Sequence, residues 1–333
     1  MSTDTEQTGK TLCFAFGDPE PILANSVMDY LGAFMNFDGT YYRPPIDLTG
    51  LANLMGANSY HGPILHFKKN MIVKWFIPSK TLSTAALKYA ALDFSVLANA
   101  YFQVFTNGFN TPVRLERLPA LSMRRGKDPD TFVKIEADGK ITSFAAGEVL
   151  HIKEPDIKQS IYGIPQYFGG IQSVLLSEDS TLFRRRFYIN GAHMGYILVT
   201  NDANLDEKTA ELIEKQVKQS KGPGNFRSLY LNIPRSSSKE PVQIIPVGNI
   251  GSKDEFQAIK EVTEMEMLAM HRVYPGLVGI MPANVGGFGD LDKSMRVYHE
   301  LEVTAMQQVF LQINEMIGGN PVAFRDPIWN TGV

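Results

Sequence analysis

Two short stretches of the chain hold residue types whose spacing could bind an anionic ligand. The first is the run Arg184–Arg185–Arg186, whose three guanidinium groups are suited to phosphate. An α-helix turns about 100° per residue, so three consecutive arginines spread around it and cannot form one stripe. We therefore expect these arginines to pair with carboxylates inside the protein or across a subunit boundary, with phosphate contact as the alternative.

The second stretch is Gly286–Gly287–Phe288–Gly289–Asp290, which precedes a predicted helix. Backbone N–H groups at a helix start can cradle phosphate, but a preceding strand and the full dinucleotide-binding glycine spacing are missing here. The nearest fragment to a P-loop, Gly9–Lys10–Thr11, lacks the glycine four residues before its Gly-Lys pair. A loop that can change shape is the favoured interpretation, and a nucleotide-binding enzyme using residues 286–290 is the alternative.

Residues for metal or nucleophilic chemistry are sparse. The six histidines form no tight metal-ligand spacing, and we expect them to be structural: His61, His66, His151, His193, His271 and His299. The single cysteine, Cys13, rules out a disulfide framework within the chain. No GxSxG nucleophile motif is present. The sequence thus predicts no metal, no cofactor and no conventional enzyme.

Composition permits many roles. The 333 residues are 44% hydrophobic and 20% charged, as in ordinary globular proteins. The formal net charge of -3 gives no overall basic excess for nucleic-acid binding. Neither a secretory signal nor an apolar run of membrane-spanning length is visible. We expect a soluble, intracellular protein in a reducing compartment.

The order of elements predicts an α+β protein that carries a stalk. An extended N-terminal arm precedes a mainly helical region and a β-rich patch, and the remaining elements follow in this order: helix 165–190, helix 206–220, a β-hairpin within 221–251, helix 252–273, glycine-rich loop 275–289 and helix 290–316. Helix 206–220 has a thin apolar face and does not suit a core. Copies arranged in a ring would bury such faces against each other.

A specific resemblance runs along most of this order, from about residue 14 to 327. The stretch Ser180–Gly195, reading STLFRRRFYINGAHMG, resembles the portal proteins of tailed bacteriophages, in particular the PBSX type. Further matching stretches occur in the same order: 14–21, 42–45, 48–52, 220–222, 225–227, 244–246, 253–256, 269–273 and 284–290. No single motif identifies the family, but the shared order and spacing of these stretches are highly specific.

The resemblance implies the α+β portal fold and assigns its parts. They would be an N-terminal arm (1–24), a mixed α/β wing (25–205), two stem helices (206–220 and 252–274), a small β-rich clip (221–251), a channel loop (275–289), and a long helix with a C-terminal wing segment (290–333). The loop would face DNA through Asn284, Val285, Gly286, Gly287, Phe288 and Gly289, and the clip would dock terminase through Asn225, Phe226, Arg227, Arg235 and Lys239. No large C-terminal crown is expected.

The implied function is a dodecameric ring at one capsid vertex of the virion, assembled in the host cytoplasm. Double-stranded DNA would be packaged and ejected through it. The implied partners are further copies of the chain, the terminase large subunit, major capsid and scaffolding proteins, and head-completion or adaptor proteins, with no membrane. Carboxylates slightly outnumber cations around the loop, which suits weak contact with sliding DNA, because tight binding needs phosphate neutralisation.

Two departures from the family pattern and two further alternatives remain. In Val273–Tyr274–Pro275–Gly276 the proline stands later in the sequence than the family pattern leads us to expect. In the last helix, Val303–Thr304–Ala305 stands where the family tends to have proline. These changes would shift the loop or straighten the last helix. The alternatives are another ring component of the head–tail connector, and a monomeric nucleic-acid-binding protein built around Arg184, Arg185 and Arg186.

Overall fold

The computed structural model describes residues 12–14, 37–189, 196–200, 229–232, 242–246, 253–280 and 290–329. Its α-helices are α2 (Leu48–Leu54), α3 (His61–Val73), α4 (Thr84–Leu97), α5 (Ile171–Ile189), α7 (Lys253–His271), α8 (Leu291–Tyr298) and α9 (Thr304–Ile317). Two 3₁₀ turns, η2 (Gln166–Gly170) and η3 (Pro275–Val278), and one π turn, η4 (His299–Val303), complete the helical elements of this part of the chain.

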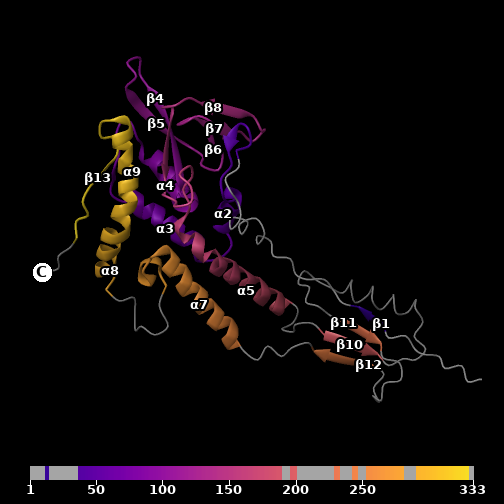
Figure 1. The fold of residues 1–333 in the computed structure, drawn as a ribbon. Coiled ribbons are helices and arrows are strands. Elements are labelled where there is room, and N and C mark those ends of the chain that lie inside the picture. The colour runs from indigo at the N-terminus through magenta and orange to yellow at the C-terminus, as the bar shows by residue number, and fades with distance from the viewer. Residues whose placement is uncertain are drawn as a thin grey trace, which may run out of the picture. The chain divides into compact units, whose positions relative to one another are not determined.

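The strands form several small sheets, labelled in Figure 1. They are β1 (Leu12–Phe14), β2 (Tyr41–Tyr42), β3 (Phe76–Ile77), β4 (Asn99–Thr106), β5 (Pro112–Leu118), β6 (Met123–Gly126), β7 (Phe132–Ile135), β8 (Ile141–Phe144), β9 (Val149–Lys153), β10 (Tyr196–Thr200), β11 (Leu229–Asn232), β12 (Val242–Pro246) and β13 (Ala323–Phe324). Helices and strands are both present, as expected for an α+β fold.

The chain divides into two compact units. The larger comprises residues 23–176 and 262–333, and the smaller comprises residues 1–22 and 177–261. Two antiparallel sheets of the larger unit have the orders β5-β4-β9 and β2-β6-β7-β8, and a third pairs β13 with β3. The smaller unit has one mixed sheet, in the order β1-β11-β10-β12.

The helices of the larger unit begin and end where local signals direct. The Asp47 carboxylate accepts the Thr49 N–H at 2.9 Å to begin α2, and the Ser83 hydroxyl accepts the Ala86 N–H at 3.1 Å to begin α4. The last N–H of α4 comes from Ala98, whose left-handed φ of 57° turns the chain directly into β4. This tight turn brings β4 back against the helix that precedes it.

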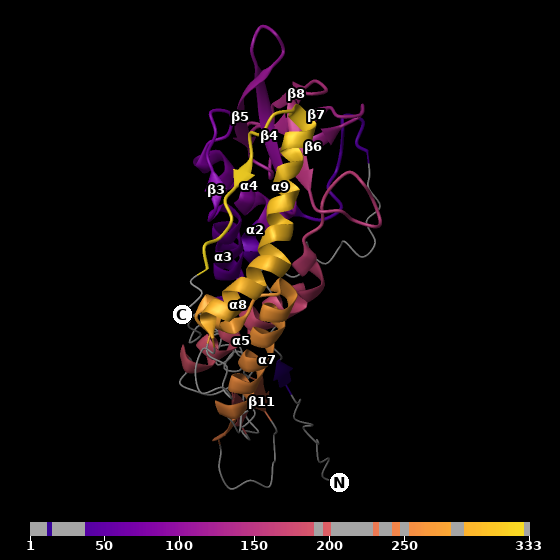
Figure 2. The ribbon, with the colours of Figure 1, turned by 90° about the vertical axis from the view of Figure 1, so that its left-hand side faces the viewer.

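The core of the larger unit lies between these helices, the sheets and α9. Phe94 of α4 meets Phe310 of α9 with ring centroids 5.5 Å apart, and Ala100 and Phe102 of β4 are fully buried in the same cluster. Figure 2 shows α9 crossing in front of α4 and β4. Burial of this apolar surface against α9 therefore holds the C-terminal helix on the body.

Most expected elements of the larger unit are confirmed, with shifted limits. The predicted helix 165–190 divides into η2 and α5, and the mainly helical region expected after the N-terminal arm contains α2, α3 and α4. Helix 252–273 is α7. Stem helix 206–220 lies outside the described residues.

The prediction of a β-hairpin within residues 221–251 is wrong. The strands β11 and β12 do not pair with each other, because β10 lies between them, parallel to β11 and antiparallel to β12. The apolar run Tyr196–Thr200 suits a central strand with a neighbour on each side. Strand β1, from the expected N-terminal arm, adds to the outer edge of β11.

The last helix is interrupted rather than straight. Between α8 and α9 the backbone makes the π turn η4, and the Thr304 hydroxyl donates to the carbonyl of His299 at 3.0 Å. A π turn contains one extra residue per turn and is a common cause of helix bending. In Figure 2 the ribbon changes direction between α9 and α8. The expectation that loss of proline straightens this helix is therefore wrong.

Candidate functional site

The described residues that lead into the expected channel loop converge on one cluster at the end of α7. We call His61, Lys68, His271, Arg272 and Glu302 the loop-base cluster. It joins α3, the last turn of α7 and the π turn η4. Residues 275–280 follow it directly in the chain, so this cluster fixes the point from which the loop departs.

The two histidines of the cluster face each other in the core. His61 Nδ1 lies 3.0 Å from His271 Nε2, and both side chains are fully buried. The Tyr167 ring lies beside both, with centroid distances of 4.8 Å to His61 and 5.2 Å to His271. Burial lowers the pKa of His61 to about 4 and that of His271 to about 2, so both imidazoles are neutral at physiological pH.

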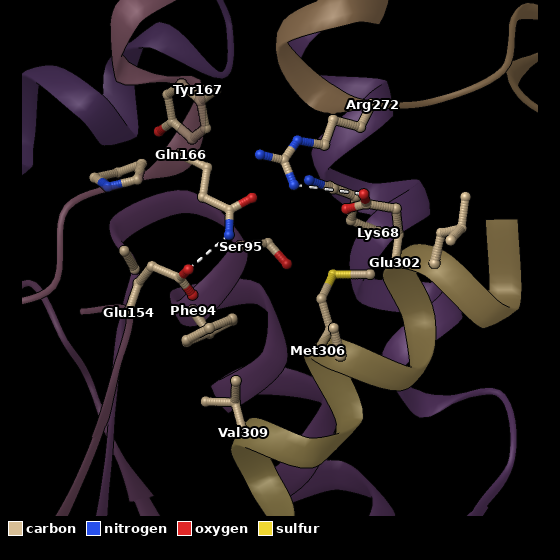
Figure 3. Close-up of a pocket in the computed structure, with 14 residues that line it drawn as sticks. Lys68, Phe94, Ser95, Glu154, Gln166, Tyr167, Arg272, Glu302, Met306 and Val309 are labelled. Atoms are coloured by element: carbon tan, nitrogen blue, oxygen red, sulfur yellow. Dashed lines mark hydrogen bonds and ion pairs between the residues drawn. The ribbon is translucent and has the colours of Figure 1, made fainter. Parts of the chain in front are cut away.

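The charged members surround a pocket of about 160 Å³. In Figure 3, Lys68, Arg272 and Glu302 point toward one another from three different elements. Arg272 Nη1 lies 3.6 Å from Glu302 Oε1, and burial lowers the pKa of Lys68 while the nearby Glu302 carboxylate opposes that shift. Across the pocket, Gln166 Nε2 donates to Glu154 Oε1 at 2.6 Å.

The pocket suits a structural role better than a chemical one. Its two cations, Lys68 and Arg272, face two carboxylates, Glu154 and Glu302, so neither sign dominates. Apolar side chains of α4 and α9, among them Phe94, Met306 and Val309, also line it. Among the residues that the structure describes, no three His, Cys, Asp or Glu side chains are placed to hold a metal ion. The arrangement connects three helical elements, α3, α7 and η4.

The backbone conformation of Arg272 and two backbone hydrogen bonds end α7 and set the direction of the chain after it. Arg272 adopts a left-handed φ of 54°, its N–H donates to the Ala269 carbonyl, and the Val273 N–H donates to the Leu268 carbonyl, both at 3.0 Å. These bonds close the helix. The late proline, Pro275, then stands at the first position of η3, where its missing N–H costs nothing.

An aromatic group joins the chain just after α3 to the π turn η4 and to the C-terminal segment. The Trp75 ring packs edge-on against His299 at 4.6 Å and against Trp329 at 6.1 Å. The Arg325 N–H donates to the Trp75 carbonyl at 2.9 Å. The C-terminal segment is therefore tied both to the end of α3 and to the π turn.

The structure describes few of the expected site residues. The channel-loop residues Asn284 to Gly289 and the clip residues Asn225, Phe226, Arg227, Arg235 and Lys239 lie outside the described residues. In α5, Arg184 is partly buried and Arg185 is exposed, and Arg186 is described only as part of the helix. The expected roles of all these residues stay predictions.

Sequence reasoning missed the loop-base cluster. His61 and His271 are 210 residues apart, so no spacing rule could pair them. None of the described helices is long and apolar enough to cross a membrane.

Two curated phage proteins match nearly the whole chain. The probable portal protein of Escherichia phage P2 is 35% identical over 325 residues, which are 97% of this chain and 94% of that protein. The probable portal protein of Haemophilus phage HP1 is 38% identical over 307 residues, covering 90% and 87% of the two chains. No family model matches the sequence.

Solved structures share the fold at low sequence identity. A chain in the neck of an empty gene transfer agent particle, computed with C6 symmetry, matches with a TM-score of 0.60 at 14% identity, covering 88% of this chain and 87% of that chain. The crystal structure of an HK97 family phage portal protein from Corynebacterium diphtheriae matches with a TM-score of 0.57 at 9% identity, covering 84% and 96%. These likenesses show the fold.

Proposed function

The chain belongs to the family of phage portal proteins, and we propose that about twelve copies of it form the ring at the portal vertex of a capsid. The observation that carries this proposal is the match to two portal proteins over at least 90% of the chain. The neck that shares its fold was computed with sixfold symmetry, which a ring of twelve copies satisfies. The role is structural rather than enzymatic.

In the ring, the helical and β-rich body would be the wing. The stem would comprise residues 206–220 and 252–274, of which α7 is the described part. Residues 221–251 would be the clip, and residues 275–289 the loop that faces DNA. The loop-base cluster supports this last assignment, because buried histidines and an ion pair fix the position from which a loop must project.

Double-stranded DNA would pass through the ring during packaging and ejection. A conduit must not retain its cargo, so strong neutralisation of phosphates would be a disadvantage. Two arginines on the segments that flank the loop already have partners. Arg272 pairs with Glu302, and Arg296 lies 5.9 Å from the Trp329 ring centroid. This leaves weak, sequence-independent contact with the duplex.

The proposed partners follow from position in the virion. The terminase large subunit, and later the head-completion or adaptor proteins, would dock on the clip. Major capsid and scaffolding proteins would contact the wing while the ring is built into the capsid. During assembly the ring would lie in the host cytoplasm, and afterwards in the virion.

Native mass spectrometry of the purified full chain, with negative-stain images, tests the proposal. A particle of about a dozen copies with a central hole is the expected result. A monomer at every concentration and after incubation with the scaffolding protein would contradict it. Titration with nucleotide and with free duplex DNA separates the alternatives, because the ring predicts no nucleotide binding and at most weak, salt-sensitive DNA binding.

A further inference from the structure

The hairpin formed by β4 and β5 extends beyond the sheet to which it belongs. Strand β9 pairs with β4 only from Asn99 to Gln103. From Phe105 onward β4 pairs with β5 alone, with a bulge between Phe105 and Thr106. Figures 1 and 2 both show the loop between these two strands projecting past the neighbouring strands of the larger unit. We call residues 106–113 the β4–β5 tip.

The β4–β5 tip is built around the side chain and backbone of Asn107. Asn107 Oδ1 accepts the N–H groups of Phe109 and Thr111, both at 3.0 Å. The Asn107 N–H donates to the Thr111 carbonyl, and the Asn110 N–H donates to the Asn107 carbonyl, also at 3.0 Å. Asn110 has a left-handed φ of 59°, which asparagine adopts more readily than most residues. These bonds fix the shape of a loop whose residues 106–111 are all exposed.

Phe109 lies at the end of this loop with its ring in solvent. It is 92% exposed, and Val113 beside it is 45% exposed. Single exposed apolar side chains are common on protein surfaces, but this one is held on a defined ribbon. Below the tip, the Arg114 guanidinium lies 4.3 Å from the Phe105 ring centroid and braces the two strands. An aromatic side chain fixed in this way loses little entropy on binding, which is the property of an interface anchor.

The chemistry of the β4–β5 tip favours a protein partner. Residues 106–113 carry no charge, and the next residue, Arg114, pairs with Glu116 at 3.1 Å. Nucleic acid is bound mainly through Lys and Arg, and a lipid surface needs several apolar residues with basic ones beside them. A phenyl ring surrounded by asparagine and threonine instead suits a socket that is apolar inside and polar at its rim.

The β4–β5 tip lies far from the loop-base cluster. Ala98 and Glu154 line the pocket beside that cluster, at the end of the sheet where Asn99 pairs with Lys153. The tip follows the other end of β4, which is about 23 Å away at the usual rise of a strand. Since residues 275–289 would face the channel, the tip belongs to the part of the larger unit that is remote from the DNA.

A neighbouring copy is a poor partner for the β4–β5 tip. Rotation about the ring axis places equivalent residues at the same radius and height, so a neighbour can meet the tip only with residues from the same end of its larger unit. The turn beside the ribbon is residues 145–148, where the Glu148 carbonyl accepts the Val104 N–H at 2.9 Å. Its two alanines, glycine and glutamate are all exposed and form no socket for a phenyl ring.

We propose that the β4–β5 tip docks on the capsid shell, and that Phe109 enters an apolar socket of the major shell protein. This role rests on the proposed ring at the portal vertex. Among the partners proposed above, the shell protein is the one that surrounds the ring in the finished virion. A rigid, uncharged tip suits a partner that is held in a fixed position.

Incorporation of the ring into capsids tests the anchor. The full chain is produced together with its capsid and scaffolding proteins, and the ratio of portal to shell protein in purified capsids is measured. Phe109→Ser changes a side chain outside the core, so ring mass and melting temperature should stay at wild-type values. We expect about tenfold less portal in capsids, because removal of an aromatic anchor weakens binding by at least that factor.

Two further variants control this measurement. Phe109→Leu keeps an apolar side chain at the tip and should retain most of the incorporation. Ile157→Ser changes another fully exposed apolar side chain, which follows β9 at the opposite end of the sheet. It should incorporate at the wild-type level. Wild-type incorporation of Phe109→Ser would overturn the proposed role of the tip and leave the ring itself intact.

Photo-cross-linking identifies what lies on the tip. Benzoyl-phenylalanine is introduced at position 109, capsids are assembled with this chain, and ultraviolet light is applied. The cross-linked peptides should come from the major shell protein, and the same analogue at position 157 should not give that product. Cross-links to a second copy of the chain, to the scaffolding protein or to DNA, or no cross-link at all, would overturn the proposal. A wild-type chain that never forms rings would overturn the proposed function together with it.

Discussion

His61 and His271 share one hydrogen bond in the core of the larger unit, with Nδ1 of the first 3.0 Å from Nε2 of the second. One of these nitrogens carries the hydrogen and the other must accept it, so at most one proton fits between the rings. Their remaining nitrogens, His61 Nε2 and His271 Nδ1, are buried without a hydrogen-bond partner. Protonation of either ring would therefore put a buried positive charge in the core and leave its outer N–H without a partner.

Acid should destabilise the protein through this pair. Burial holds the pKa of His61 near 4 and that of His271 near 2, below the ordinary value of 6.5. Between these values and pH 6.5 the unfolded chain binds more protons than the folded one, so the free energy of unfolding falls as pH falls. The expected slope is up to about 1.4 kcal/mol per pH unit for each histidine. Chemical denaturation at pH 4.5 to 7.5 measures it.

Substitution isolates the contribution of the pair. His271→Gln should be less stable at pH 7 and should show a shallower pH slope than the wild type. His66→Gln, at an exposed position, is the control and should keep the wild-type slope. The comparison between variants matters because His151 is also buried with a lowered pKa and adds its own slope. Equal slopes for wild type and His271→Gln would contradict this account.

Arg117 should be needed for the stability of the body. Its Nε and Nη2 donate to the two oxygens of Asp93 at 2.7 Å each, and the Asp93 side chain is only 11% exposed. Burial raises the pKa of Asp93, and Arg117 opposes that shift. Arg117→Ala would leave this carboxylate without its partner and should cost about 2–3 kcal/mol of unfolding free energy.

The matched control for Arg117→Ala is Arg114→Ala in the same strand. Arg114 pairs with Glu116 at 3.1 Å, but both side chains are more than half exposed. Solvent screens such a pair, so the loss should stay below about 1 kcal/mol. Urea denaturation of both variants checks the difference, and equal losses would refute the importance of burial here.

Gly163 should not tolerate a side chain. A Cβ there would overlap the Ala98 carbonyl oxygen and lie 2.8 Å from the Glu154 nitrogen. The Gly163 N–H also donates to Asn99 Oδ1 at 2.8 Å, and its carbonyl accepts from Asn99 Nδ2 at 2.9 Å, so the backbone is fixed. Gly163→Ala should cost about 1–3 kcal/mol. Gly169→Ala, where an added Cβ has no neighbour within 4 Å, should be nearly neutral in the same melting experiment.

Loop flexibility should be needed for DNA translocation and not for assembly. Replacing Gly286 and Gly287 with proline restricts the backbone that would change shape as DNA passes. The double variant should form rings of wild-type mass but fail to package DNA in an assay with terminase and capsids. Normal packaging by this variant would exclude a shape-changing role for these glycines.

Local patterns in the sequence were sufficient for most helices and for the family. The limits of α3, α4 and α7 follow from apolar spacing, caps and glycine or proline near their ends, which act over a few residues. The family follows from many short stretches in a fixed order, each of which can be compared without knowing the fold. The relatives at 35% and 38% identity confirm that comparison.

Tertiary structure alone decided how distant segments meet. The position of β10 between β11 and β12 depends on which strand gains two neighbours, and strand propensity does not encode that choice. The π turn η4 arises where α8 and α9 pack on different neighbours, so the proline rule could not predict it. The His61–His271 bond joins residues 210 positions apart. Only the path of the backbone through space could bring those two rings together.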